Sequence, residues 1–276
     1  GMSCLFRARE YDRPMPFTPP SWAHKFRKPE DLRGRDINLY GTNFWWMEVG
    51  GEQDSIHDTE TLRDELLKIA FGVFDYIKNY APDCDKYANW GLDWQGFLPG
   101  KRESRRYVGD HMLTQNDIEA EGRFDDIVAY GGWSMDDHFP AGFYHPKAGT
   151  IFHPAPSPYG IAYRTLYSRN IENLFCAGRC HSATHAAMSS TRVMATTSLM
   201  GQAAGTAAAL AVQHSTSPRG VYESHMAELQ QQLMDDDCYL PWKVREIAPL
   251  SRTSKFNADV GDPESLRNGV DRPVGD

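Results

Sequence analysis

Residues 177–209, AGRCHSATHAAMSSTRVMATTSLMGQAAGTAAA, hold the pattern that decides the fold. A polar turn of Arg, Cys, His, Ser and Thr precedes residues 193–212, which carry no charge and are mostly small. The pattern predicts a short apolar strand at 173–178, then the polar turn, then a long helix from about Ser190 to Val212. The function depends on what the start of this helix faces.

A membrane span is one explanation of the uncharged stretch. Its length suits a bilayer, and Gly201 and Gly205 have the G-x-x-x-G spacing of packed transmembrane helices. However, the stretch contains several Ser, Thr and Gln residues, has few large aliphatic residues and lacks aromatic belts. We therefore expect no membrane span, and we predict a helix buried within a soluble domain with neighbouring backbones packed closely on it.

A zinc site is a second explanation, because Cys176, Cys180, His181 and His185 form the pattern C-x-x-x-C-H-x-x-x-H. These residues straddle a tight turn, and Cys176 lies in the apolar strand pattern, which makes one tetrahedral site awkward. A hydrogen-bonded polar turn with buried thiols is the simpler interpretation. We predict no metal, and a zinc-stabilised structural domain stays as a third hypothesis.

A flavin explains more of the pattern. A helix that opens at Ser190, Thr191 and Arg192 would present free backbone N–H groups and the positive end of its dipole. Such an end suits a group that gains negative charge during reaction, as the N1–C2=O edge of a reduced flavin does. The Ala and Gly residues at 203–208 would let the helix pack closely beneath the cofactor.

The composition limits the possible partners and the compartment. The 276 residues are 41% hydrophobic and 12% aromatic, which is typical of a globular protein of one or two domains. A net charge of −8 argues against nucleic acid or an anionic membrane surface as the main partner. Five scattered cysteines and the lack of a signal-peptide pattern indicate reduced thiols in a cytoplasmic protein.

The remaining segments predict a mixed α/β (α+β) fold. Five prolines at 11–36 indicate an extended arm, and residues 37–51 have the aromatic and β-branched content of a strand. An amphipathic helix begins behind Asp58 and ends before Pro82, with apolar residues at Leu62, Leu66, Ile69, Val73 and Ile77. Short aromatic-rich segments at 84–170 predict an antiparallel or mixed sheet, and residues 221–236 predict a last helix.

The turn and the long helix also carry a resemblance. The runs NLF-x-AGR-x-x-SATH-x-A-x-x-STRVMAT and GQAAGTAAA resemble the carboxy-terminal flavin-binding segment of the FAD-dependent oxidoreductase family. The stretches WWMEVGGEQDSIHDTETLRDELLKIAFG, LPGKRESRRYVGDHMLTQ and HPAPSPYGIAYRTLYSRNI resemble the substrate-side region of that family. The resemblance covers roughly residues 40–212.

The resemblance implies a set of site residues. His185 would face the reaction chamber, where an imidazole that titrates near neutral pH can serve as acid or base; alternatively it ties down the turn. Several residues would lie near the isoalloxazine or the pyrophosphate of FAD, and we include His181 of the turn and Ser190 at the predicted helix start with them. The predicted cofactor-binding residues are Gly178, Arg179, His181, Ser190, Thr191, Arg192 and Val193.

Candidate substrate-binding residues lie in 101–170. In KRESRR, a strand would place Arg102 and Arg106 on one face, where they could clamp an anionic substrate or the pyrophosphate; a solvated strand with a Glu–Arg bridge is the alternative. We also assign His138 and Tyr159, from the His-, Pro- and aromatic-rich stretches, to the substrate side, although loop histidines near prolines are often structural.

One feature of the family pattern is missing. The family should open with a strand and G-x-G-x-x-G that receives the ADP half of FAD, yet no two of the 23 glycines are separated by a single residue. Either the chain is a carboxy-terminal fragment, or another chain completes it, or FAD binding has been lost. We expect a homo-oligomer or a second chain that supplies the nucleotide-binding half.

These observations lead to one main hypothesis. The chain is a FAD-dependent oxidoreductase, or its carboxy-terminal portion, which moves hydride or electrons between a small-molecule substrate and flavin. The alternative is a flavin-free scaffold or binding subunit. We expect an arm at 1–36, a substrate domain at 37–170, the carboxy-terminal part of an incomplete FAD-binding domain at 171–250 and a polar tail at 251–276.

Overall fold

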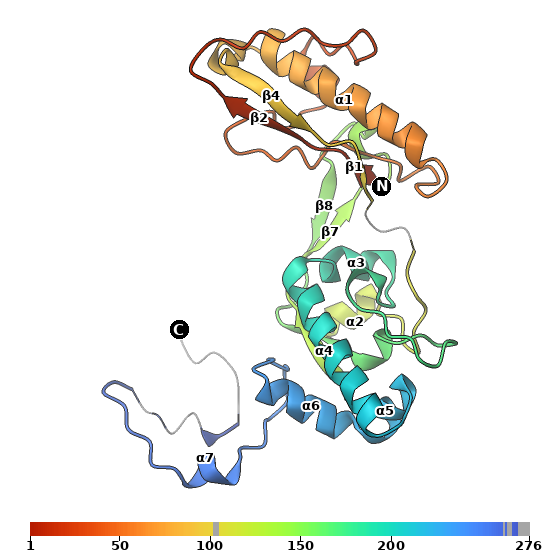
Figure 1. The fold of residues 1–276 in the computed structure, drawn as a ribbon, viewed down its shortest axis with the longest axis vertical. Coiled ribbons are helices and arrows are strands. Elements are labelled where there is room, and N and C mark those ends of the chain that lie inside the picture. The colour runs from red at the N-terminus through yellow and green to blue at the C-terminus, as the bar shows by residue number, and fades with distance from the viewer. Residues whose placement is uncertain (102–104, 262, 264–266, 270–276) are drawn as a thin grey trace. The chain divides into compact units, whose positions relative to one another are not determined.

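The computed structural model describes residues 1–101, 105–261, 263 and 267–269 (Figure 1). This part of the chain forms seven α-helices and several small antiparallel sheets, so the fold is mixed α/β, as predicted. The helices are α1 (Thr59–Asn79), α2 (Gln115–Glu119), α3 (His185–Thr191), α4 (Met194–Gln213), α5 (Pro218–Ser224), α6 (Met226–Asp235) and α7 (Pro249–Thr253). The strands are β1 (Met2–Ser3), β2 (Phe6–Glu10), β3 (Glu48–Val49), β4 (Trp90–Gln95), β5 (Gly100–Lys101), β6 (Ile127–Gly131), β7 (Met135–His138), β8 (Thr150–His153) and β9 (Tyr159–Ala162).

The chain divides into two compact units, each with its own apolar core. Unit 1 comprises Gly1–Ser104 and Asp137–Ile151, and unit 2 comprises Arg105–Asp136 and Phe152–Asp276. The chain passes between the units at residues 104–105 and again within β7 and β8, which pair with each other. The sequence predicted four parts that differ in role: an arm, a substrate domain, a cofactor domain and a tail. This division by role stays a prediction.

Helix α1 forms the core of unit 1, and its apolar spacing is confirmed. Leu62 is 6% exposed, and the four other predicted core residues of the helix are fully buried. Phe74 of α1 packs edge-on against Phe6 of β2, with ring centroids 5.5 Å apart. Within this unit α1 lies alongside the antiparallel pair β2 and β4 (Figure 1). Asp58 directly precedes the helix as predicted, but its side chain makes no capping hydrogen bond.

The proline-rich segment 11–36 lies along α1. The amide of His24 donates to the carbonyl of Lys68 at 3.1 Å, and the ring of Phe17 meets that of Phe74 edge-on at 4.8 Å. Gly72 is the residue that lets the two backbones approach, because a Cβ there would lie 2.5 Å from the His24 carbonyl oxygen. The segment contains no strand; it includes a 3₁₀ turn at Pro29–Leu32 and a turn closed by the Ala23 amide, which donates to the Pro20 carbonyl at 3.0 Å.

The strand predicted over residues 37–51 is wrong, because only Glu48–Val49 pair in a sheet. Short polar side chains hold the rest of this segment in local turns. The amide of Tyr40 donates to Asn38 Oδ1 at 3.0 Å, and the amide of Trp45 donates to Asn43 Oδ1 at 3.2 Å. Such side-chain bonds compete with a sheet ladder for the backbone N–H groups, and the aromatic content of the segment does not reveal them.

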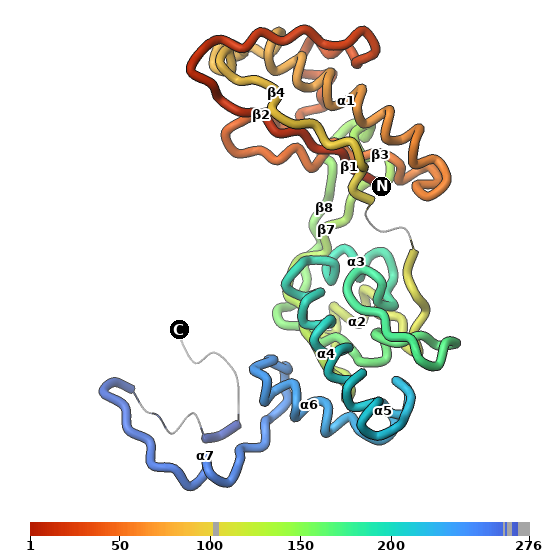
Figure 2. The backbone as a smooth tube through the Cα atoms, viewed as in Figure 1, coloured from red at the N-terminus to blue at the C-terminus, as the bar shows by residue number. Residues whose placement is uncertain are grey.

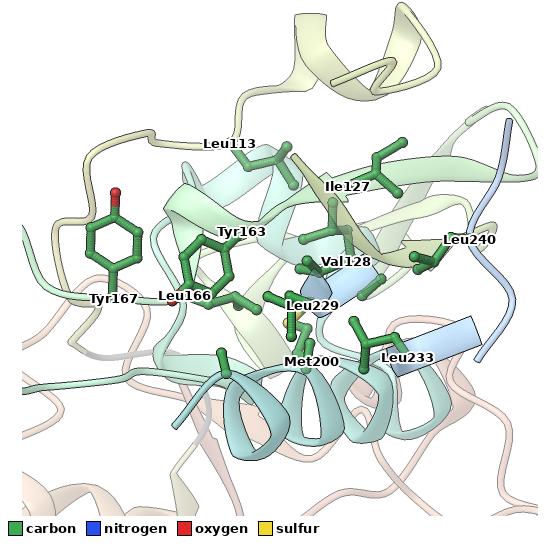
Figure 3. Close-up of a cluster of buried hydrophobic side chains, with 14 of the residues drawn as sticks. Leu113, Ile127, Val128, Tyr163, Leu166, Tyr167, Met200, Leu229, Leu233 and Leu240 are labelled. Carbon is green, nitrogen blue, oxygen red and sulfur yellow. The ribbon is translucent and has the colours of Figure 1, made fainter. Parts of the chain in front are cut away.

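Unit 2 is built around the antiparallel pair β6 and β9, with α4 packed against β6 and α6. Its core gathers apolar side chains from these elements, among them Val128 of β6, Met200 of α4 and Leu229 of α6 (Figure 3). A two-stranded sheet cannot bury itself, so the helices supply most of the cover that this unit requires.

The single helix predicted from Ser190 to Val212 is wrong. Helix α3 ends at Thr191, Arg192 forms its C-cap, Val193 has an extended ψ of 149°, and α4 begins at Met194 (Figure 2). The sequence contains no Gly or Pro at this break, so nothing in it marks the interruption.

Two further elements in unit 2 differ from the prediction. The predicted strand at 173–178 is wrong, because in this segment Phe175 forms only an isolated bridge with Tyr167. The predicted last helix at 221–236 is two helices, α5 and α6, separated at His225, whose φ is −130°. The second difference arises because the backbone of His225 leaves the helical conformation.

Helix α4 has one buried face and one exposed face. Met200, Ala203 and Ala207 are fully buried, whereas Met194 and Val212 are 88% and 81% exposed. The expectation of a buried helix with neighbouring backbones packed closely on it is wrong for the described residues, because one face is exposed and a Cβ on Gly201 or Gly205 would meet nothing within 4 Å. Within the described ranges, no helix combines the length and apolar content needed to cross a membrane.

Candidate functional site

The predicted turn lies beside the start of α4 in unit 2. It is a 3₁₀ turn, Gly178–Cys180, which begins at a Gly178 φ of +66°, a left-handed conformation that favours glycine. A Cβ on Gly178 would have as its nearest neighbour the Cβ of Thr197, 3.8 Å away. The side chains of Arg179 and Cys180 are exposed. The turn therefore borders the first turn of α4.

His181 fixes this turn from inside. Its ring is fully buried, Nδ1 donates to the Gly178 carbonyl at 2.6 Å, and Nε2 lies 3.2 Å from Oγ1 of Thr191. Because the carbonyl can only accept, the proton of a neutral ring is on Nδ1 and Nε2 accepts from the Thr191 hydroxyl. His181 and Thr191 thus connect the turn to the end of α3 and position its backbone.

Ser190 belongs to a second buried connection. Its Oγ donates to the Trp133 carbonyl at 2.5 Å, which leaves Oγ to accept a hydrogen bond from the hydroxyl of Tyr159. Burial raises the pKa of Tyr159 to about 12, although the hydrogen bond with Ser190 lowers it. Both side chains are fully buried. The phenol is therefore neutral at physiological pH and ties β9 to α3.

Arg192 occupies the break between α3 and α4. Its Nη2 donates to Oδ2 of Asp136 at 3.1 Å and to the Asp136 carbonyl at 3.2 Å. The two side chains are 15% and 20% exposed, so the pair is screened less than a surface pair. The guanidinium thus attaches the break to residue 136 in β7 and fixes the direction in which α4 begins.

The exposed rim of the site consists of other residues. His185 is the exposed first residue of α3, directly after Thr184, whose Oγ1 accepts from the Ala187 amide at 3.4 Å. Met194 and Ala195 are exposed in the first turn of α4. Any molecule that approaches this end of unit 2 would meet these side chains before it met Ser190 or Thr191.

The start of α4 matches what a flavin edge requires. Val193 occupies the N-cap position and has no polar side-chain atom that could accept a hydrogen bond. The amides of residues 194–196 therefore have no partner within the helix, and they sit at the positive end of its dipole. An exposed Arg179 lies on the adjacent turn. These donors suit the N1–C2=O edge of a reduced flavin, whereas the sequence has no G-x-G loop for the ADP half.

The predicted substrate-binding residues fall in different parts of the structure. Arg102 lies outside the described residues, and Arg106 is half-buried at the start of unit 2. His138 lies in unit 1, where Nδ1 is 2.7 Å from Oε2 of Glu48 and the two side chains are 13% and 9% exposed. Tyr159 lies in the core of unit 2. Their role in substrate binding stays a prediction.

The four residues with zinc-like spacing have dissimilar surroundings. Cys176 is 4% exposed and His181 is fully buried, whereas Cys180 and His185 are exposed. Both ring nitrogens of His181 already have hydrogen-bond partners. A metal at this turn would have to break both bonds and draw buried and exposed side chains to one point.

The sequence did not reveal two residues that shape the site. Asp136 pairs with Arg192, which is 56 residues away in the sequence. The Trp133 carbonyl accepts a hydrogen bond from Ser190, which is 57 residues away. Both lie in GGWSMDD, where they were visible only as an aromatic and an acidic residue near a predicted strand. No local spacing signals such pairs, because they form only when β7 and α3 meet.

Comparison with protein families confirms the resemblance. The model of the family described as FAD dependent oxidoreductase matches residues 5–233, most of the chain. The chain therefore belongs to the FAD dependent oxidoreductase family, and its general function is FAD-linked redox chemistry. Neither the curated proteins nor the solved structures gave a match.

Proposed function

We propose that this chain forms the ring side of a FAD-dependent oxidoreductase that acts on a small-molecule substrate. The observation that carries the proposal is the start of α4, where backbone amides without a side-chain cap border the Gly178 turn and an exposed Arg179. Membership in a family of FAD-dependent enzymes supports a flavin as the ligand of this surface. The compartment we propose is the cytoplasm, in keeping with five free cysteines.

A second polypeptide segment would supply the ADP-binding half. Two observations support this part of the proposal: the sequence has no G-x-G, and α4 leaves Gly201 and Gly205 uncovered along one face. Small residues on a helix let another backbone approach closely, so this face suits a packed strand or helix. The segment could belong to the same gene product or to another subunit, whereas a second copy of this chain would bring no G-x-G of its own.

Each group at the site would have a distinct role. A bound flavin supplies the transfer of hydride or electrons between substrate and cofactor. The α4 amides would stabilise negative charge on the ring, and Arg179 would add a positive charge at the same edge. His185 would give or take the substrate proton. His181, Ser190, Thr191 and Arg192 would position the backbone, because their side chains have partners within unit 2.

A reconstitution experiment tests the proposal. The genomic sequence beside the region that encodes this chain is searched for a G-x-G-x-x-G strand–turn–helix, and that segment is co-expressed with the chain. A yellow complex with a flavin absorption spectrum that reduces with an electron donor supports the proposal. A folded complex that stays colourless after incubation with FAD supports the flavin-free scaffold instead.

The reconstituted enzyme also tests the role of His185. We expect His185→Gln to lower kcat by about 10²–10⁴-fold while the flavin spectrum is retained, because only the proton partner is lost. His57→Gln is the matched control, since His57 is an exposed histidine that pairs with Asp54 in unit 1. Equal kcat values for the two variants would show that His185 is not the proton donor or acceptor.

A further inference from the structure

Two histidines and a glutamate meet in unit 2 where α4, α5 and α6 join. We call His214, His225 and Glu228 the His–His–Glu cluster. His214 is the C-cap of α4, His225 lies between α5 and α6, and Glu228 is in the first turn of α6. No motif discussed above includes these residues, and the proposed flavin chemistry does not use them.

The cluster brings three ligand atoms together. Oε2 of Glu228 lies 2.9 Å from Nε2 of His214 and 3.3 Å from Nδ1 of His225. The imidazole rings stack, with centroids 3.8 Å apart and an interplanar angle of 16°. One nitrogen from each ring and one carboxylate oxygen all lie within 4.8 Å of one another. Ligands about 2.0–2.1 Å from a tetrahedral zinc ion are separated by about 3.3 Å, so only small side-chain movements would be needed.

The supporting backbone is well fixed. The amide of His214 donates to Leu210, and the amide of His225 donates to Val221, both at 2.9 Å. Leu210, Val221 and Leu229 are buried in the core of unit 2, next to the three ligand-bearing turns. The cluster residues are partly exposed, with side-chain values of 29% for His214, 24% for His225 and 43% for Glu228. A cation could therefore enter from solvent and meet side chains on packed elements.

The local electrostatics favour a cation. His214 follows the carboxy-terminal end of α4, where helix carbonyls carry partial negative charge, whereas His225 lies between the negative end of α5 and the positive start of α6. Glu228 adds a full negative charge. Two imidazole nitrogens and one carboxylate oxygen form a ligand set that suits zinc and other borderline divalent cations.

We propose that the His–His–Glu cluster binds one Zn²⁺-class divalent cation through Nε2 of His214, Nδ1 of His225 and Oε2 of Glu228, with solvent completing the coordination. Ligation replaces the two imidazole–carboxylate hydrogen bonds. Each ring then directs to the cation the lone pair of the nitrogen that faces Glu228 in the metal-free structure. The cation joins the end of α4 to the junction of α5 and α6 and thereby stabilises unit 2.

Four other imidazole–carboxylate pairs provide an internal comparison, among them His138 with Glu48 at 2.7 Å. His57 with Asp54, His24 with Glu65 and His111 with Asp117 each join one ring to one carboxylate at 2.6–3.1 Å. Among the described residues, only the His–His–Glu cluster gathers three potential ligand atoms. The number of ligand atoms, three instead of two, therefore distinguishes the proposed chelating site from these pairs.

The test is a zinc titration of tag-free, chelator-treated, FAD-free protein. We expect one saturable equivalent of Zn²⁺ by calorimetry and a rise in Tm. His214→Ala and His225→Ala should each abolish the saturable site and the Tm rise, and Glu228→Gln should weaken both. His57→Ala should bind Zn²⁺ as the original chain does. Far-UV circular dichroism checks that each variant is folded.

Cobalt substitution provides a second readout on the unaltered chain. We expect visible d–d absorption without the near-ultraviolet charge-transfer bands of a cobalt–thiolate bond, because the cluster has only nitrogen and oxygen ligands. Cobalt–thiolate bands would show that the metal binds to cysteines instead of the His–His–Glu cluster, and they would overturn the proposal. No saturable zinc binding, or binding retained by both histidine variants, would overturn it as well. None of these measurements depends on flavin.

Discussion

Ser190 joins the hydroxyl of Tyr159 to the backbone of Trp133 in the core of unit 2. The two partners of this connection should respond differently to deletion. Ser190→Ala leaves the buried Tyr159 hydroxyl and the partly buried Trp133 carbonyl without Ser190 as a partner, so we expect a loss of about 1–3 kcal/mol in the free energy of unfolding. Tyr159→Phe should cost less, because Ser190 can still donate to Trp133. Urea unfolding measures both, and a larger loss for Tyr159→Phe would contradict the assignment of donors.

The cysteines beside the turn provide a second prediction at this scale. Burial, and to a lesser degree the charge of Cys180, raise the pKa of Cys176 to about 11, and its side chain is 4% exposed. Cys180 is exposed. Near neutral pH, iodoacetamide should therefore modify Cys180 in the folded chain and leave Cys176 intact until denaturant is added. Peptide mass spectrometry measures this, and equal modification in the native state would show that the turn is open.

Individual pairings were the least predictable feature from sequence. His181 and Arg192 stood out as polar residues at a turn, yet their partners Thr191 and Asp136 lie 10 and 56 residues away. The sequence placed Ser190 and Thr191 at the start of a helix. In the structure both are buried at the end of α3, where their hydroxyls form hydrogen bonds inside unit 2. These side-chain pairings can be identified only from the folded structure.

Among the elements, α4 determines the interpretation of the site. Its Gly201 and Gly205 are exposed and a Cβ there would meet nothing within 4 Å, so Gly201→Ala and Gly205→Ala should each stabilise the isolated chain by about 1 kcal/mol. The same substitutions should weaken association with the nucleotide-binding segment, because each methyl group separates the packed backbones. Thermal unfolding measures the first effect and calorimetry the second.

Ala208→Gly, at a half-buried position of the same helix, is the control for these substitutions. It should destabilise the isolated chain through helix propensity alone. If Gly201→Ala stabilised the chain and left association unchanged, the exposed face of α4 would not be the docking surface.

Element boundaries show where sequence patterns are sufficient. The helix α1 was predictable because its apolar residues recur at three and four and all are buried. The break between α3 and α4 was not, since Ala, Ser, Thr and Met continue through it without a Gly or Pro. It depends on Arg192 reaching Asp136 and on the extended backbone of Val193. These are tertiary contacts that no local propensity encodes.

For the whole molecule, the family and the mixed fold were predictable, whereas the division into units was not. The motif at 173–196 identified the family, and the family match over 5–233 confirms it. Unit 1 includes residues 1–36 as well as 137–151, because Met2, Phe6 and Phe143 share one core. Segments so far apart in sequence join only through packing, which a pattern within one window cannot reveal.

The central claim is that this chain holds the ring side of a flavin site and lacks the nucleotide side. The most direct measurement is a FAD titration, followed by flavin fluorescence and gel filtration, of the isolated chain and of its complex with the nucleotide-binding segment. We expect the isolated chain to lose FAD on the column and the complex to retain one FAD per site. Tight, stoichiometric FAD binding by the isolated chain would contradict the claim.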